Sequence, residues 1–208
     1  MSFSKVTQFE NQLAEYFGAP FCVATDCATH AIELCLRLKK IKKTGCPSHT
    51  YLSITMTLEK LGIDWQFNNN RWEDFYKFTN TNIYDAAVFW TPRGYIKGSM
   101  MCLSFQFKKT LSLGRGGAIL LDNKDEAEHL RRMAYDGRNR DEPWTEQLHS
   151  ISQIGYHYYM TPETAQQGLE KLSTVKKNKD WSWQDYPDLS QVPVFKNKKY
   201  EQISNTRG

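Results

Sequence analysis

Apolar residues in the first part of the chain follow helical spacing and then strand spacing. Phe9, Leu13 and Phe17 recur every four residues, which is typical of one buried face of a helix. Gly18 predicts the end of this helix. The apolar run Phe21–Thr25 comes next and has the length of a buried strand. The pattern therefore starts as a helix followed by a strand.

The same alternation continues to about Lys176. Short apolar runs predict strands, and longer runs with helical periodicity predict helices. Further strands are expected at 63–67, 83–90, 100–107 and 117–122, and further helices at 26–40, 51–62, 124–137 and 161–175, with a turn over 44–50. This alternation predicts an α/β fold with a mostly parallel sheet flanked by helices. In such sheets, ligands bind at the carboxyl ends of the strands, next to helix N-termini.

The 208 residues suffice for one sizeable hydrophobic core. We interpret residues 1–175 as one domain and residues 176–208, where the pattern fades, as a C-terminal tail or stub. The net charge of +4 is mild, and much of the lysine excess lies in this tail. A nucleic-acid interface would require a basic stripe interleaved with stacking aromatic residues, and a solvated, frayed terminus explains the lysines more simply. No nucleic-acid partner is expected.

The five cysteines are scattered and odd in number, without a CxxC pair. They predict free thiols in a reducing cytosol, and hence a cytoplasmic protein. No apolar stretch approaches the length of a membrane span, so no membrane partner is expected. No metal site is expected either, because the histidines show neither HxxxH spacing nor clustering with cysteine.

Small and polar residues follow the first predicted strand. Asp26, Cys27, Ala28 and Thr29 lie where a helix is expected to begin. Free backbone N–H groups and the Thr29 hydroxyl would form a cradle for a phosphate there. Simple N-capping by Asp26 or Thr29 accounts for the same residues and is favoured when they are considered alone.

An aromatic residue and an acid lie at two later boundaries. Tyr51 starts the helix expected at 51–62, where it would either stack on a planar ring or belong to the core. Asp85 follows two apolar residues of a predicted strand. A buried carboxylate requires a cationic or N–H partner, and a pyridinium N–H, an arginine or a turn amide would each serve.

The stretch SFQFKKTLSLGRGG places Ser104 and Lys109 across the end of a strand. A lysine beside apolar residues has a lowered pKa, which favours Schiff-base formation with an aldehyde. Gly114, Gly116 and Gly117 would let the backbone pass close to a ligand. The alternative is an ordinary surface lysine in a hairpin-like turn. Together, a phosphate cradle, an aromatic ring, a carboxylate and a lysine are the parts of a pyridoxal phosphate site.

These motifs lie within a longer resemblance. From about Phe9 to Leu172 the chain resembles the DegT/StrS family of sugar aminotransferases, through FENQLAEYFGAPFCVATDCATHAIELCL, PSHTYLSITMTLEKLGI, YDAAV and IGYHYYMTPETAQQGLEKL. The most specific match is SFQFKKTLSLGRGG, since the family has SFxxxK, a short spacer and then GxGG. This register selects Lys109 rather than Lys108 as the Schiff-base residue.

The resemblance implies a large domain like that of pyridoxal-phosphate-dependent transferases of the aspartate-aminotransferase type, with the C-terminal small domain missing or reduced. It implies pyridoxal 5'-phosphate as cofactor, with Lys109 binding it and moving the proton and Asp85 pairing with its ring nitrogen. Tyr51 would stack on the ring. Ala28, Thr29 and Ser104 would hold the phosphate. His157 takes the place of an asparagine that, in the family, reaches the phosphate across a homodimer interface.

Several positions depart from the family pattern. Val88 stands where the family usually has glutamine or histidine, and Arg115 where glutamate is common. Ala28 replaces a glycine, His157 an asparagine and Tyr159 an arginine. The connection between residues 67 and 83 is shorter than the strand–helix unit that the family has there.

The sequence therefore favours an aminotransferase that moves an amino group, with glutamate as the expected donor, to a nucleotide-linked keto sugar for polysaccharide or glycan synthesis. One alternative is a reduced family member that binds pyridoxal phosphate or a partner subunit but turns over little. Another keeps the cofactor but changes the reaction, for example to dehydration. A phosphate-binding ATPase is disfavoured, because GRGG lacks the GxxxxGK[ST] spacing of a P-loop.

Overall fold

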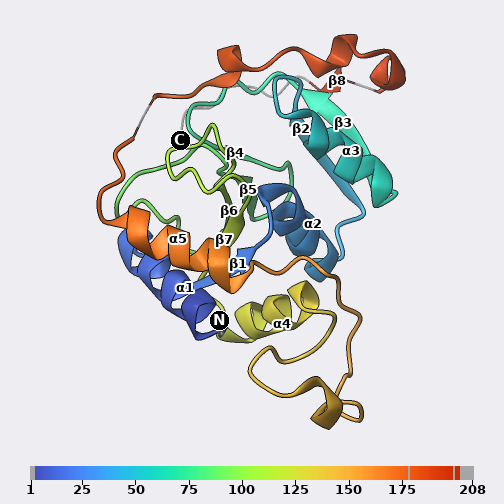
Figure 1. Ribbon diagram of the computed structural model, residues 1–208. Helices are drawn as coiled ribbons and strands as arrows, with labels where there is room; N and C mark the ends of the chain where they lie inside the picture. The colour runs from blue at the N-terminus through green and yellow to red at the C-terminus, as the bar shows by residue number, and fades with distance from the viewer. Residues whose placement is uncertain (1–2, 178, 199, 202–208) are drawn as a thin grey trace.

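The computed structural model describes residues 3–177, 179–198 and 200–201. Helices lie on both sides of a central sheet (Figure 1). Five strands form this sheet in the order β1-β7-β6-β5-β4, and three form a second sheet in the order β2-β3-β8. The strands are β1 (Phe21–Thr25), β2 (Lys43–Pro47), β3 (Asp64–Asn68), β4 (Tyr76–Lys77), β5 (Ile83–Asp85), β6 (Met100–Ser104), β7 (Gly117–Leu121) and β8 (Tyr200–Glu201).

The helices follow the predicted periodicity closely. They are α1 (Ser4–Phe17), α2 (Ala28–Leu38), α3 (Leu52–Lys60), α4 (Lys124–Ala134) and α5 (Pro162–Leu172), with short 3-10 helices η1 (Trp144–Glu146), η2 (Trp183–Asp185), η3 (Leu189–Gln191) and η4 (Pro193–Phe195). Gly18 ends α1 as predicted: it adopts φ +73°, and backbone N–H groups at this end return to the carbonyls of Ala14 and Glu15. Among the described residues, no helix combines the length and the apolar character that crossing a membrane requires.

The α/β class is confirmed, whereas the strand directions are mixed. In the main sheet β1, β5 and β6 run in one direction, and β4 and β7 run in the other. The pairs β2–β3 and β3–β8 are parallel. Strand β7 opposes β6 because a loop, rather than a crossover helix, joins the two strands.

Strand alternation divides the core between the two faces of the main sheet. On β6, Met100 and Cys102 belong to the cluster beneath α2 and α4, while Met101 and Leu103 belong to the cluster beneath α1 and α5. Both clusters are closed to solvent, since all four side chains are buried. The main sheet therefore lies between two helical layers. The loops that follow β5 and β6 emerge at the carboxyl ends of these strands.

Two segments differ from the sequence expectation. Residues 44–50 were expected to form a turn, but most of them belong to β2, which pairs with β3. The polar connection before β5 contains β4, which pairs with β5. Neither strand has a strong local pattern, because its stability comes from hydrogen bonds to its partner strand rather than from its own residues. The run 83–90 yields only the short strand β5, since the backbone turns after Asp85.

The described part of the tail is packed rather than solvated and frayed, which corrects the interpretation of its lysines. Phe195 is buried, and its ring contacts those of Trp65 and Phe67 in β3. Leu189 is buried too, and its N–H donates to the carbonyl of Ser48. The apolar residues of the tail are too sparse to show helical or strand periodicity. They nevertheless cover one face of the second sheet, which would otherwise be exposed.

Candidate active site

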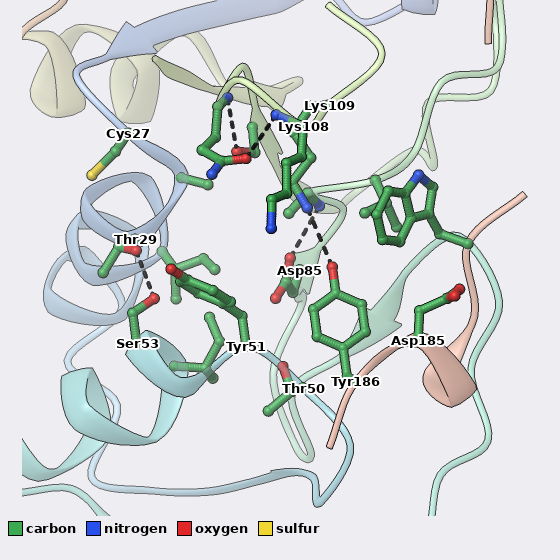
Figure 2. A pocket seen from close by; sticks show the side chains of 18 of the residues that line it. Cys27, Thr29, Thr50, Tyr51, Ser53, Asp85, Lys108, Lys109, Asp185 and Tyr186 are labelled. Atoms are coloured by element: carbon green, nitrogen blue, oxygen red, sulfur yellow. Dashed lines mark hydrogen bonds between the residues drawn. The ribbon is translucent and has the colours of Figure 1, made fainter. Parts of the chain in front are cut away.

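A cavity of about 910 Å³ opens where β5 and β6 end, against the N-terminus of α2. This volume lies within the usual range for sites that hold a cofactor or substrate. The cavity collects six of the seven predicted site residues: Ala28, Thr29, Tyr51, Asp85, Ser104 and Lys109. They come from four separate segments of the chain (28–29, 51, 85 and 104–109), so the tertiary structure brings them together. Figure 2 shows Thr29, Tyr51, Asp85 and Lys109 around the cavity.

Lys109 and Asp85 lie at the centre of this cavity (Figure 2). The Lys109 amine donates to the Tyr186 hydroxyl at 3.2 Å. Burial lowers the pKa of the Lys109 amine; the Asp85 charge opposes this effect and that of Lys108 adds to it. A larger neutral fraction makes this amine a better nucleophile and proton acceptor than a surface lysine.

Asp85 is buried at the end of β5 but has two hydrogen-bond donors. The Tyr76 hydroxyl donates to Oδ2 at 2.8 Å, and the Ala87 N–H donates to Oδ1 at 3.0 Å. Burial raises the pKa of Asp85, while the Ala87 N–H, the Tyr76 hydroxyl and the Lys109 charge act in the opposite direction. A carboxylate has room for further donors, so a cationic N–H inside the cavity would find an acceptor here.

The N-terminus of α2 forms another wall of the cavity. The first N–H groups of a helix lack helical acceptors and favour an anion. Gly117, at the start of β7, lies directly against this terminus: a Cβ there would come within 2.4 Å of the Cys27 carbonyl carbon and 2.5 Å of the Ala28 nitrogen. Only glycine permits this approach, which explains one of the glycines after Lys109.

The capping alternative for Asp26 and Thr29 is not what the structure shows. The N-cap of α2 is Cys27, without a side-chain capping bond. The Thr29 hydroxyl instead lies 2.7 Å from the Ser53 hydroxyl at the start of α3. Both hydroxyls line the cavity, so this terminus is available to a ligand.

The structure corrects the statement that no histidine clusters with cysteine. Asp26, Cys27 and His30 bring their ligand-type atoms within 4.8 Å of one another, because residues three apart lie on one side of a helical turn. The Asp26 carboxylate is engaged by two cationic side chains, His30 at 2.7 Å and Arg115 at 2.7 Å. We therefore assign this cluster a structural role at the start of α2.

The His30 imidazole should make stability depend on pH. Burial opposes its charged form, but hydrogen bonds to Asp26 and Cys27 raise the pKa of His30 to about 9, above its ordinary 6.5. The charged imidazole thus stabilises the fold fully below pH 6.5, and this stabilisation is lost as the pH rises through about 9. We expect a loss of about 2 kcal/mol in the free energy of unfolding over this range, after allowance for partial exposure.

Urea unfolding at several pH values measures this effect, with His30→Gln as control. At low pH the variant should have a smaller free energy of unfolding than the wild type. Its free energy of unfolding should also fall less as the pH rises over the same range. Equal pH slopes in the two proteins would contradict the assignment.

His157, the seventh predicted residue, does not enter this cavity. It is exposed, it contacts Asp136 at 3.1 Å, and it lines a separate cavity of about 280 Å³ together with Arg115 and Tyr159. Its predicted role requires a second chain, so the position of His157 within one chain leaves that prediction untested.

Sequence reasoning missed the aromatic wall of the cavity. Trp72 and Tyr76 come from the polar connection, and Trp181 and Tyr186 come from the tail. The cluster WSWQDY was the available signal in the tail, because aromatic residues rarely gather in a solvated terminus. Val88, where the family usually has glutamine or histidine, is buried and lines the cavity.

Solved structures with the same fold include proteins described as aminotransferases. AtS13 from Actinomadura melliaura matches at 20% identity with a TM-score of 0.69, covering 83% of this chain and 60% of that one. The sugar aminotransferase CalS13 from Micromonospora echinospora matches at 14% identity and a TM-score of 0.66, covering 82% and 60%. Spr1654 from Streptococcus pneumoniae, solved in its PLP form, matches at 18% identity and 0.66, covering 82% and 59%.

These likenesses establish the fold of an aminotransferase large domain, and this chain spans about three fifths of the length of those proteins. The sequence pattern of the DegT/DnrJ/EryC1/StrS aminotransferase family matches residues 1–75 and 94–186. The chain therefore belongs to this family. The gap in the match falls on β4, β5 and the following turn, where the connection is short. A search of curated proteins found no match.

Proposed function

We propose that this chain is a pyridoxal-phosphate-dependent aminotransferase. The observation that carries the proposal is the partly buried Lys109 amine, which shares one cavity with the buried Asp85 carboxylate and the N-terminus of α2. Pyridoxal phosphate combines an aldehyde, a pyridine nitrogen and a phosphate, so an amine, a carboxylate and an anion cradle fit it chemically. When bound, it supplies a carbonyl group that takes up an amino group and a ring that withdraws electrons.

The phosphate would bind where α2 begins. The backbone N–H groups of Ala28 and Thr29, the Thr29 hydroxyl and the Ser104 hydroxyl line this part of the cavity. The support for this assignment is the close approach of Gly117, which keeps the first turn of α2 free of side chains on that side. Tyr51, at the start of α3, is assigned to stack on the ring, since its side chain is exposed and lines the cavity.

Two titratable groups would divide the proton chemistry. Asp85, held by Tyr76 and the Ala87 N–H, would keep a ring N–H protonated by accepting from it. Burial lowers the pKa of Lys109, so its Nζ would accept a proton in one step of amino transfer and release it in a later step. Such proton transfer contributes on the order of 10²- to 10⁴-fold to a rate.

We further propose glutamate as amino donor, a nucleotide-linked keto sugar as acceptor, and polysaccharide or glycan synthesis as the pathway. The protein is proposed to be a cytoplasmic homodimer with His157 contributing to the partner's site, and light scattering tests its mass. We propose 1–175 as the cofactor-binding domain and 176–208 as a C-terminal tail, of which Trp181 and Tyr186 line the same cavity. CalS13 from Micromonospora echinospora, described as a sugar aminotransferase, supports the acceptor class.

A second candidate function is a reduced homologue that binds the cofactor, or a partner subunit, with little turnover. One observation favours it: the apolar Val88 lines the cavity at a position where the family usually has glutamine or histidine. This candidate predicts cofactor binding without amino transfer.

Titration with pyridoxal phosphate tests the proposal. We expect the protein to develop the yellow absorbance of a lysine-bound cofactor, because the Lys109 amine is neutral more often than a surface amine. Borohydride reduction and peptide mapping should place the adduct on Lys109. Addition of glutamate should then bleach the colour, and a nucleotide-linked keto sugar should restore it. A colourless protein at saturating cofactor would refute cofactor binding, and colour without bleaching by glutamate would favour the second candidate.

A further inference from the structure

Tyr186 reaches the centre of the cavity from the far end of the chain. Its hydroxyl accepts from the Lys109 amine at 3.2 Å (Figure 2). The Lys109 amine also lies 5.2 Å from the Trp181 ring centroid. A hydroxyl that accepts a hydrogen bond from a lysine favours the protonated form of that lysine. The rings of Trp181 and Tyr186 attract the same positive charge.

The segment that carries Tyr186 is fixed in place. Its ring lies 5.3 Å from that of Trp72, and its backbone carbonyl lies 2.8 Å from His49 Nδ1. Leu189 then anchors the chain on Ser48. Because contacts hold both the ring and the backbone of Tyr186, its hydroxyl has little freedom to move away from the Lys109 amine.

We propose that Tyr186 is a positioning residue for Lys109: its hydroxyl accepts a hydrogen bond from the amine, stabilises the protonated form and directs it into the cavity shared with Asp85. The consequence for amino transfer rests on the proposed function, whereas the hydrogen bond itself does not.

Among the described residues, two charged groups act on the Lys109 amine. Asp85 faces it from β5, and Lys108 precedes it on the same loop. Asp185 and Tyr51 act on Tyr186 itself, and together with Asp85 and burial, which is the largest cause, they raise the pKa of the Tyr186 hydroxyl. Tyr186 therefore stays a neutral hydroxyl while Lys109 titrates. The chain offers a parallel: the Lys60 amine donates to the Tyr158 hydroxyl at 3.1 Å, and this bond is the first cause that raises the pKa of Lys60.

The test is the pH midpoint of lysine labelling in the cofactor-free protein. Limiting acetic anhydride is applied across the alkaline range, and mass spectrometry of the peptides gives the midpoint for each lysine. In Tyr186→Phe the ring remains but the acceptor is lost, so the Lys109 midpoint should fall by about one pH unit. Tyr158→Phe is the matched control and should move the Lys60 midpoint downward without moving that of Lys109.

An unchanged or raised Lys109 midpoint in folded Tyr186→Phe would overturn the proposal, and circular dichroism establishes that the variant is folded. A borohydride-trapped pyridoxal adduct is mapped in the wild-type protein in parallel. Its absence from Lys109 would refute the proposed function and leave the midpoint comparison intact. If the adduct forms, its pH profile should shift downward in Tyr186→Phe as the labelling midpoint does.

Discussion

Lys109→Ala is expected to lower the rate of the glutamate half-reaction by at least about 10³-fold, because the amine that would accept and return the proton is gone. The measurement is the rate at which glutamate bleaches the bound cofactor in a single turnover. The N-terminus of α2 and Asp85 should still bind pyridoxal phosphate in this variant with reduced affinity, which equilibrium dialysis measures. Added methylamine should restore part of the rate, since a small amine can enter the space that the lysine leaves.

Lys108→Ala is the matched control for this prediction. Lys108 also lines the cavity, but its side chain is exposed, and its amine lies 5.5 Å from the Phe107 ring centroid. We expect its half-reaction rate to stay within a few-fold of wild type. A larger loss in Lys108→Ala than in Lys109→Ala would show that the register chosen from SFxxxK is wrong.

Gly117→Ala is expected to destabilise the fold by about 3 kcal/mol and to weaken pyridoxal phosphate binding. The new methyl would come within 2.4 Å of the Cys27 carbonyl carbon and 2.5 Å of the Ala28 nitrogen, and backbone atoms cannot move aside as a flexible side chain can. Relief requires α2 to shift away from β7, which displaces the N–H groups assigned to the phosphate. Urea unfolding measures the stability, and cofactor titration measures the affinity.

Gly114→Ala separates this contact from a general effect of replacing glycine in the same loop. Gly114 has φ +78°, but a Cβ there would meet nothing within 4 Å. Its substitution should cost about 1 kcal/mol, for backbone conformation alone. Equal losses in the two variants would mean that the approach of Gly117 to α2 does not limit stability.

The sequence alone determined the parts of this molecule that depend on local patterns. The spacing of Phe9, Leu13 and Phe17 defines α1, and Gly18 ends it, because helix periodicity and the left-handed end are properties of neighbouring residues. Asp85 and Ser104 were expected near strand ends, and both line the cavity. The apolar pattern placed the strands but extended both of them too far, and an α/β sheet brings the ends of its parallel strands together at one edge.

Tertiary structure alone decided the directions of the strands, the strands β2 and β4, and the aromatic wall of the cavity. Strand β4 has two residues and exists because it pairs with β5. Tyr76 thereby reaches Asp85, nine residues away, and Tyr186 reaches Lys109, 77 residues away. The stability of these contacts comes from burial and from pairing with another segment, which is near in sequence for Tyr76 and distant for Tyr186. Such pairing leaves no periodic signal in the residues that make the contacts.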